Sequence, residues 1–377
     1  MKRFKIISLF LALALIILFF NSYAAHVGEQ GKAGEQDKVE QGKVEQSKIV
    51  EQGKAVAQVK SDKREITRTF RARGIVQIQT MSGSCSFKKG KNHEIIVQVI
   101  MDSSAGLFEP IMEEERYTNT LILRDKSQGS DEGSNARWIV TVPEKTGIKS
   151  SSISGNFSVV GLNGEIAAKT ISGDIIARDC SGNLRFVSVD GVIKVQDLKG
   201  TIQLKGISSN IEFKNLSGKM EINTASGEIR GTELNGDISC AVASGDVEIN
   251  KAEGGFKIKT ASGDIDASDI TILAASEFKV TSGEVEVVLS KSAEHNLTLV
   301  STAGSAILNY NGNPIKGWFE FKALSERGNI VSPFKFDKEE IKEEWNQKYD
   351  VKGFQKDSDS PKIHIFTSSG EAVLKEK

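Results

Sequence analysis

Apolar side chains recur in blocks of nine residues from Gly155 to Ile270. In each block the second, fourth and seventh positions after a glycine are apolar, as at Ile193, Val195 and Leu198. The second and fourth positions fall on one face of a strand, because side chains alternate with a period of two. The seventh position breaks that alternation by one residue, so the chain must bend or bulge after the fifth position. This period predicts a solenoid repeat.

Glycine opens almost every block, where we expect a corner at which a Cβ atom would be hard to place. Ser209 takes the place of glycine once, and Gly231 is the one clear lapse among the apolar positions. The predicted corner glycines are Gly155, Gly164, Gly173, Gly182, Gly191, Gly200, Gly218, Gly227, Gly236, Gly245, Gly254 and Gly263.

A second period doubles the first. Ser-Gly followed by an acidic residue marks alternate blocks, for example at residues 172–174, 244–246 and 262–264. The sequence therefore predicts an all-β parallel solenoid with eighteen residues per coil, in two nine-residue sides, and a spacing of about 4.8 Å between stacked sides. A left-handed hexapeptide helix needs an apolar residue every six positions, and a calcium-binding nonapeptide roll needs two glycines and an aspartate in each turn. Neither pattern occurs here.

Two segments precede the first strand signals. Residues 1–25 combine a basic start, a long apolar run and small residues before a cleavage position, which predicts a signal peptide or an uncleaved N-terminal anchor. Residues 26–63 are rich in Glu, Gln, Gly and Lys and could bury too little apolar surface to become ordered, which predicts a disordered spacer. A contact between this spacer and a cell-wall polymer is the alternative.

The rest of the chain divides into three parts. Residues 64–143 carry strand signals without the nine-residue period and are expected to form an N-terminal β cap, which solenoids need to prevent end-on association. Residues 144–289 are the regular solenoid. Residues 290–377 are expected to form irregular C-terminal coils with a charged insertion and a final strand.

The charged insertion covers residues 325–360. Within it, Asp337 to Lys348 suggests a short helix, with Asp337 as the N-cap and with Ile341 and Trp345 on one face. Strand residues follow the insertion, so the chain is expected to leave the solenoid and return to it.

Three features together resemble the bacterial putative-adhesin family. They are the strand Trp-Ile-Val-Thr-Val-Pro at 138–143, the Ser-Gly-Asp corners, and the terminal Thr-Ser-Ser-Gly strand at 367–370. The resemblance covers roughly residues 65–377. It implies a right-handed β-solenoid in an exported or membrane-anchored protein whose family is a domain of unknown function.

The sequence offers few candidate catalytic residues. The histidines His26, His93, His295 and His364 are scattered, so they form no general-base cluster. Residues 144–290 contain no His, Trp or Tyr with which a sugar groove could be built. We therefore expect no enzyme and no cofactor.

The cysteines do not predict a disulfide or a metal site. Cys85, Cys180 and Cys240 fall on inward positions. Cys180 and Cys240 are more than three coils apart, roughly 15 Å along the axis, whereas a disulfide needs Cα atoms within about 7 Å. Buried free thiols are expected.

One column of acidic residues is a candidate site. Glu228, Asp246 and Asp264 follow the corner glycine in three successive coils, with Asn210 before them. Stacked carboxylates about 5 Å apart repel one another, so a weak calcium site is one hypothesis. The alternative is that Asp or Asn after glycine bonds the local backbone of a turn.

These observations favour an exported, non-catalytic β-solenoid of the cell envelope that acts as a structural or adhesive binding platform. We expect it in the periplasm, at the cell surface or outside the cell, with an envelope protein or polymer as its partner. A net charge of −1 gives no reason to expect nucleic acid, and a membrane would be contacted only through an uncleaved N-terminal segment. Two alternatives stay open: an accessory binding partner in envelope-stress signalling, and a carbohydrate-active enzyme.

Overall fold

The computed structural model describes residues 63–91, 93–102, 109–126 and 136–377. The predicted signal segment and all of the predicted spacer except Lys63 lie outside the described residues. The described strands belong to one compact unit, Lys60–Lys377. Within the described residues, no helix is long and apolar enough to cross a membrane.

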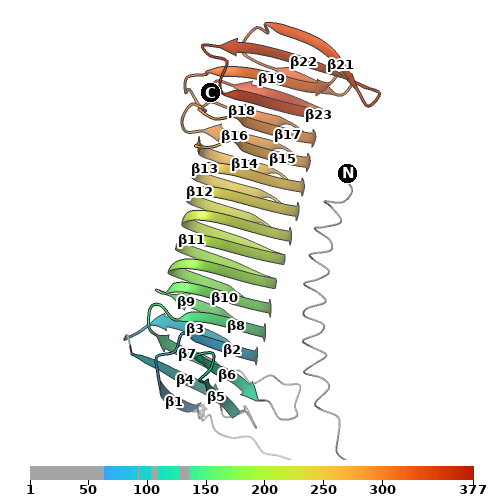
Figure 1. Cartoon of the computed structure of the whole chain (residues 1–377). Coiled ribbons are helices and arrows are strands. Elements are labelled where there is room, and N and C mark those ends of the chain that lie inside the picture. The colour runs from blue at the N-terminus through green and yellow to red at the C-terminus, as the bar shows by residue number, and fades with distance from the viewer. Residues whose placement is uncertain (1–62, 92, 103–108, 127–135) are drawn as a thin grey trace, which may run out of the picture. The chain divides into compact units, whose positions relative to one another are not determined.

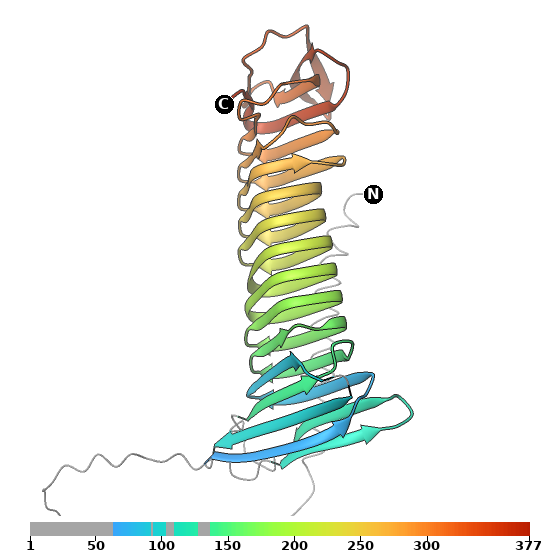
Figure 2. The ribbon, with the colours of Figure 1, turned by 90° about the vertical axis from the view of Figure 1, so that its left-hand side faces the viewer.

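The described residues form one sheet of 23 strands that winds into a stack of coils (Figures 1 and 2). The N-terminal strands are β1 (Lys63–Arg71), β2 (Ile75–Ser82), β3 (Ser84–Lys89), β4 (Glu94–Asp102), β5 (Glu109–Glu115), β6 (Thr120–Lys126) and β7 (Arg137–Val142). The stacked strands are β8 (Gly147–Ser154), β9 (Phe157–Val160), β10 (Asn163–Ser172), β11 (Ile175–Ser226), β12 (Ile229–Ser244), β13 (Val247–Ser262), β14 (Ile265–Ile272), β15 (Ser276–Ser282), β16 (Val285–Leu289), β17 (Leu297–Ala303) and β18 (Ala306–Asn309). The C-terminal strands are β19 (Gly317–Leu324), β20 (Gly328–Val331), β21 (Lys338–Glu344), β22 (Gln347–Lys356) and β23 (Lys362–Lys375).

Parallel pairing in the middle of the stack joins each residue to the one eighteen positions further along the chain. Ile211 pairs with Ile229, Ile229 with Val247, and Val247 with Ile265. Residues with the same place in the repeat therefore lie above one another in successive coils, and each place becomes a column along the stack.

The interval lengthens toward the C-terminus. Lys257 pairs with Glu277, and Ser276 pairs with Leu297, so the offsets there are 20 and 21 residues. The extra residues enlarge the connections between strands and leave the pairing itself parallel. The predicted loosening of the period after Ile270 is confirmed.

The corner glycines stack directly on one another. All the predicted corner glycines except Gly155 have φ between +113° and +156°, a region that L side chains rarely adopt. A Cβ atom on Gly245 would also lie under 3.0 Å from the carbonyl oxygen of Gly227, one coil earlier. Both the backbone conformation and the close stacking therefore require glycine.

The bulge expected after the fifth position of every block is present on only one of the two sides of each coil. On the other side the prediction is wrong: the sixth position is buried, as at Ser188, and the seventh position, Val189, is only partly buried. One residue per coil has φ between +52° and +60° although it is not glycine. Such a left-handed residue shifts the alternation of side chains by one, so the seventh position turns inward again. These bulge residues are Asp179, Asp197, Asn215, Glu233, Lys251 and Asp269.

Hydroxyl groups bind the corner from inside. The buried Thr260 Oγ1 donates a hydrogen bond to the carbonyl oxygen of Gly245 (3.2 Å), one coil earlier. Ser301 donates to Gly283 (2.7 Å) in the same way. The hydroxyls thus satisfy their own hydrogen-bonding need inside an apolar core while they tie neighbouring coils together.

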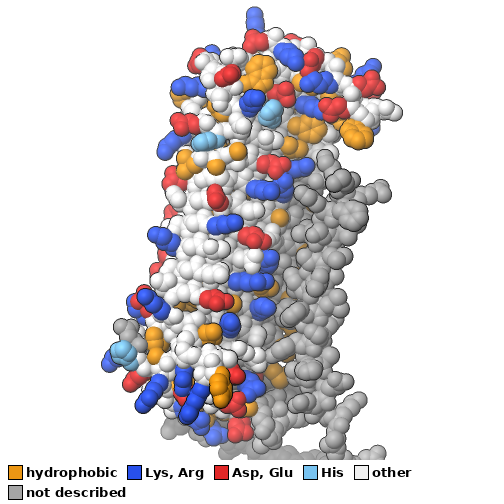
Figure 3. Space-filling view, viewed as in Figure 1, with side chains coloured by type: hydrophobic (Ala, Val, Ile, Leu, Met, Phe, Trp, Pro, Cys, Tyr) orange, Lys and Arg blue, Asp and Glu red, His pale blue; other side chains and the backbone are white. Residues whose placement is uncertain are grey.

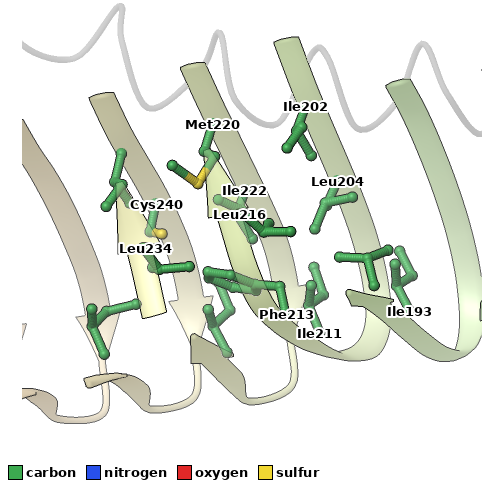
Figure 4. Packing of buried hydrophobic residues seen from close by; sticks show 14 of the residues in the cluster. Ile193, Ile202, Leu204, Ile211, Phe213, Leu216, Met220, Ile222, Leu234 and Cys240 are labelled. Atoms are coloured by element: carbon green, nitrogen blue, oxygen red, sulfur yellow. The ribbon is translucent and has the colours of Figure 1, made fainter. Parts of the chain in front are cut away.

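The core is a continuous set of apolar columns (Figure 4). Ile249 is fully buried and Glu248 is exposed, as the nine-residue register requires. The three cysteines are buried and free. Burial raises the pKa of the Cys85 and Cys240 thiols to about 12, which keeps them protonated and unreactive.

Gly231, the lapse in the apolar pattern, is filled from the neighbouring coil. A Cβ atom at Gly231 would meet the ring of Phe213 at under 3.0 Å. Phe213 pairs with Gly231 in the register, so the ring takes the volume that an apolar side chain would otherwise occupy. A large residue in one coil is thus matched by a small one in the next, because protein interiors are packed to a nearly constant density.

Antiparallel strands finish the N-terminal end. β2 and β3 continue the parallel stack through β8 and β9. β5 pairs antiparallel with β6, and both β7 and β1 pair antiparallel with β4. Residues 64–143 therefore contain both the first strands of the parallel stack and the antiparallel strands that lie at its end.

At the C-terminal end, the final strand inserts into the stack. β23 pairs in parallel with β17 on one side and with β19 on the other, so it separates two strands that precede it in sequence. β22 then pairs antiparallel with β19, and β21 with β22. The expected departure and return of the chain is therefore observed.

The helix predicted between Asp337 and Lys348 is wrong. This segment contains β21, the two-residue turn Trp345-Asn346 and the start of β22. The strand β19 offers an edge for β22, and Tyr349 packs on Leu324 there, so tertiary pairing outweighs the local capping signal.

We predict that Gly245→Ala destabilises the full chain by about 2–4 kcal/mol, because the new Cβ combines a positive φ with a backbone clash. Chemical denaturation followed by circular dichroism measures the effect. Gly147→Ala is the matched control, since its Cβ would meet no atom closer than 3.4 Å. Equal midpoints for the two variants would contradict the requirement for glycine at the corner.

Candidate interaction surface

The acidic corner column forms a ladder of hydrogen bonds between coils. The backbone N–H of Asp264 donates to Oδ1 of Asp246 (2.8 Å), and the N–H of Glu284 donates to Oδ1 of Asp264 (2.7 Å). Asn210 accepts from the N–H of Glu228 in the same way (3.0 Å). Asp or Asn after the corner glycine therefore bonds the backbone of the next coil, whereas the sequence suggested a bond within the same turn.

The candidate calcium residues do stack, but their oxygen atoms have other partners. Asp246 and Asp264 each accept a backbone hydrogen bond, and Glu228 forms an ion pair with Arg230. Among the residues that the structure describes, no group of three or more His, Cys, Asp or Glu has the geometry to hold a metal ion. The calcium site stays a prediction, and the ladder gives the column a structural role.

A second acidic column runs beside the corner. Glu248, Asp266 and Glu286 occupy one outward position in three successive coils. Arg230 pairs with Glu248 (3.2 Å) at one end and Lys375 with Glu286 (3.1 Å) at the other. Partial burial, together with repulsion from Glu286 and Glu248, raises the pKa of Asp266. This stretch of the surface is therefore predisposed to bind positive charge.

A cluster of aromatic and charged side chains lies on the outer side of the C-terminal strands. The Lys322 ammonium is 4.3 Å from the centre of the Tyr349 ring and 5.7 Å from that of Phe366. It also donates to Glu344 Oε2 (2.7 Å), which lowers the pKa of Glu344. Cation–π contact and the ion pair hold Lys322 in place, with its side chain only 25% exposed.

A small pocket opens next to this cluster. It has a volume of about 280 Å³ and is lined by Glu320, Lys322, His364, Ile365 and Phe366. His364 Nδ1 lies 3.3 Å from Glu320 Oε1. The pocket combines a carboxylate, an ammonium, an imidazole and an aromatic ring, and is of a size that fits one polar side chain or one unit of a polymer.

Trp345 marks the end of the β21–β22 hairpin. It is 94% exposed, and it adopts φ +56° in the hairpin turn, followed by Asn346 at +60°. Such turns favour Asn and Gly, and a bulky residue at positive φ is uncommon. Figure 3 shows that apolar side chains gather at this end of the stack, whereas the middle of the same view is mostly polar.

The sequence did not single out this surface, although it named His364 as one of the scattered histidines. Glu320 and Lys322 alternate with buried Phe319 and Phe321, which signals a strand with one outward face. No local signal shows that His364 lies beside Glu320, because that depends on the insertion of β23 next to β19.

The fold and surface define a parallel β-solenoid closed by antiparallel strands. The chain belongs to the family described as Toastrack DUF4097, whose model matches residues 38–316. That family is a domain of unknown function, so membership establishes the architecture and leaves the ligand open. A comparison with curated proteins gives no match.

Solved structures similar to this chain share little sequence with it. One is named a "putative cell adhesion protein" from Clostridium sporogenes, with 11% identity over 84% of this chain and 100% of that one, and a TM-score of 0.21. A "putative adhesin" from Parabacteroides distasonis has 15% identity over 68% and 92% of the two chains, with a TM-score of 0.29. A "putative lipid binding protein" from the same organism has 12% identity over 83% and 98%, with a TM-score of 0.27. These names describe those proteins, and similarity at this level carries no argument about the function of this chain.

We predict that Asp264→Ala lowers the free energy of unfolding by about 0.5–1.5 kcal/mol, because the N–H of Glu284 exchanges its carboxylate acceptor for water. Asp264→Asn keeps an oxygen at the same place and should stay within about 0.5 kcal/mol of the parent. Urea denaturation of the parent and both variants measures the difference. Equal loss in the Ala and Asn variants would show that the charge, and not the hydrogen bond, is what matters.

We predict that Asp266→Asn stabilises the protein slightly at pH 7. A raised pKa in the folded state means that folding binds protons between the unfolded pKa, about 3.9, and the raised value, so the stability of the parent falls as pH rises through that interval. The gain should be ~0.5 kcal/mol or less after solvent screening, and should vanish below about pH 3. Denaturant unfolding of the parent and the variant at pH 7 and pH 3, each in low salt and in 1 M salt, tests the cause. If the gain in the free energy of unfolding is unchanged by both acid and salt, it is not electrostatic.

Proposed function

We propose that the chain is an exported, non-catalytic binding platform of the cell envelope, built on a right-handed β-solenoid with eighteen residues per coil. The observation that carries the proposal is the C-terminal cluster, where Lys322, Phe366 and the adjacent pocket combine charge, aromatic surface and concavity. Interfaces draw most of their binding energy from small groups of aromatic and cationic side chains in such settings.

The rest of the described surface is better suited to a structural role than to catalysis. Outward positions repeat as columns of short polar and charged side chains, so most of the stack is regular and polar (Figure 3). Solenoids commonly use such extended surfaces to bind other molecules. In this proposal the coils present the recognition surface at the C-terminal end of the stack, and we expect residues 1–25 to direct export.

The partner in this proposal is an envelope protein or polymer that presents polar groups next to apolar surface. The pocket can accept one such group, with the Phe366 ring as its apolar wall and His364 and Glu320 as hydrogen-bonding groups. Contact over a shallow surface of this size predicts weak binding that gains strength when the ligand repeats along a polymer.

We predict that Phe366→Ala weakens binding to envelope material about tenfold, because the variant loses the aromatic wall of the pocket. Co-sedimentation of the full chain with isolated cell-wall polymer, and affinity capture from envelope extracts, measure the loss. Val300→Ala is the matched control, since Val300 pairs with Phe366 in the same outward column one coil away.

Two results would contradict the proposal. Equal binding by the Phe366→Ala and Val300→Ala variants would remove the cluster from the binding surface. Release of soluble fragments from a glycan polymer by the purified parent would make the protein an enzyme instead of a platform.

A further inference from the structure

The last strand of the stack has an open edge. Within the described residues, β21 pairs with β22 on one side and with no strand on the other, and Figure 1 places it at the outer end of the C-terminal strands. Every side chain of β21 except that of Glu340 is exposed. An edge of this kind is a template for pairing with another strand, and proteins control it through the charges placed along it.

The charges on β21 alternate in sign on one face. Lys338, Glu340, Lys342 and Glu344 occupy every second position, so they share one side of the strand. Within the chain, Glu340 lies 3.1 Å from Lys338 and 2.9 Å from Lys342. An edge that only had to repel other strands would be served by charges of one sign, whereas this alternation can also be matched by a complementary strand.

We propose that the complementary strand is β21 of a second copy of this chain, paired antiparallel about Ile341. In that register Lys338 lies opposite Glu344 of the second copy. Glu340 lies opposite Lys342, and the twofold symmetry repeats both pairs. All four cross-strand pairs on this face therefore join opposite charges, and directly opposed pairs are the unit that stabilises a sheet.

No neighbouring register offers the same match. If the centre of pairing moves to position 340, Lys338 lies opposite Lys342 of the second copy, and the two copies of Glu340 lie opposite each other. A shift to position 342 sets Glu340 opposite Glu344 and Lys342 opposite itself. Sliding one strand past the other by a single residue is also excluded. Residues that lie opposite each other would then point to opposite faces of the sheet. The sequence of the edge thus selects one register.

The other face of the strand adds an apolar contact. Ile341, which is 68% exposed in the single chain, meets Ile341 of the second copy. Glu339 meets Glu343 of the second copy, which is unfavourable, but each of these carboxylates has a lysine beside it. Lys352 lies 2.9 Å from Glu339, and Lys348 is the register partner of Glu343.

The resulting assembly is closed. Antiparallel pairing of one strand with its own copy has twofold symmetry, so each chain uses its only copy of the edge and no third chain can add there. The sheet would run without a break from one solenoid into the other, joined at their C-terminal ends. A seven-residue edge buries little surface, so the dimer is expected to be weak and dependent on concentration.

Cysteine cross-linking of the full chain tests the register. Ile341→Cys places two thiols opposite each other, and mild oxidation should give a disulfide-linked dimer on a non-reducing gel. Glu339→Cys is the matched control: its opposite residue is Glu343, so it should remain monomeric, and the double variant Glu339→Cys/Glu343→Cys should cross-link. The native cysteines are buried and do not compete. Cross-linking by Glu339→Cys alone, or none by Ile341→Cys, would overturn the register.

Charge exchange tests the cause of pairing. Lys338→Glu/Lys342→Glu makes this face wholly acidic, and Glu340→Lys/Glu344→Lys makes it wholly basic. By sedimentation velocity, each variant alone should dimerise at least about tenfold more weakly than the parent, and an equimolar mixture should recover dimer as the mixed species. Circular dichroism verifies that each variant is folded. A parent that stays monomeric at every concentration, a mixture that recovers no dimer, or oligomers larger than a dimer would overturn the proposal.

Discussion

The stacking of backbone on backbone at the glycine corners is the constraint on which the rest of this structure depends. At Gly245 and its counterparts, the chain turns in a left-handed conformation directly against the carbonyl group of the previous coil. No side chain fits between the two backbones at these glycines, so the glycine corners fix the separation of neighbouring coils, and Ser209 is the exception in the column. Once the corners are fixed, every other place in the repeat must align into a column.

Each column then has its own physical task. Inside the corner, hydroxyls such as that of Thr260 bind the carbonyl groups of the coil before. Outside the corner, carboxylates such as that of Asp246 accept from the N–H of the coil after. The corner is therefore held by hydrogen bonds on both sides, which explains why an acidic residue or Asn recurs after the corner and why these residues need no ligand to account for them.

The ends of the stack differ from its middle, because the first and last coils each have a neighbouring coil on one side only. Antiparallel strands close both ends, and the C-terminal end brings β19, β22 and β23 together from distant parts of the sequence. Aromatic side chains and the proposed recognition surface occur there, where the strict period no longer dictates each position. The open edge of β21 is one consequence of the same problem.

The sequence by itself determined the solenoid. The positions of Gly173 and Gly245 and the inward Ile249 follow from a period that each coil repeats, so local pattern and tertiary pairing carry the same information there. Only the tertiary structure decided the rest. Phe213 of the neighbouring coil fills the space at Gly231, and His364 meets Glu320 because β23 returns to the stack. The segment 337–348 becomes a hairpin because β19 offers it an edge, a long-range pairing that no local signal encodes.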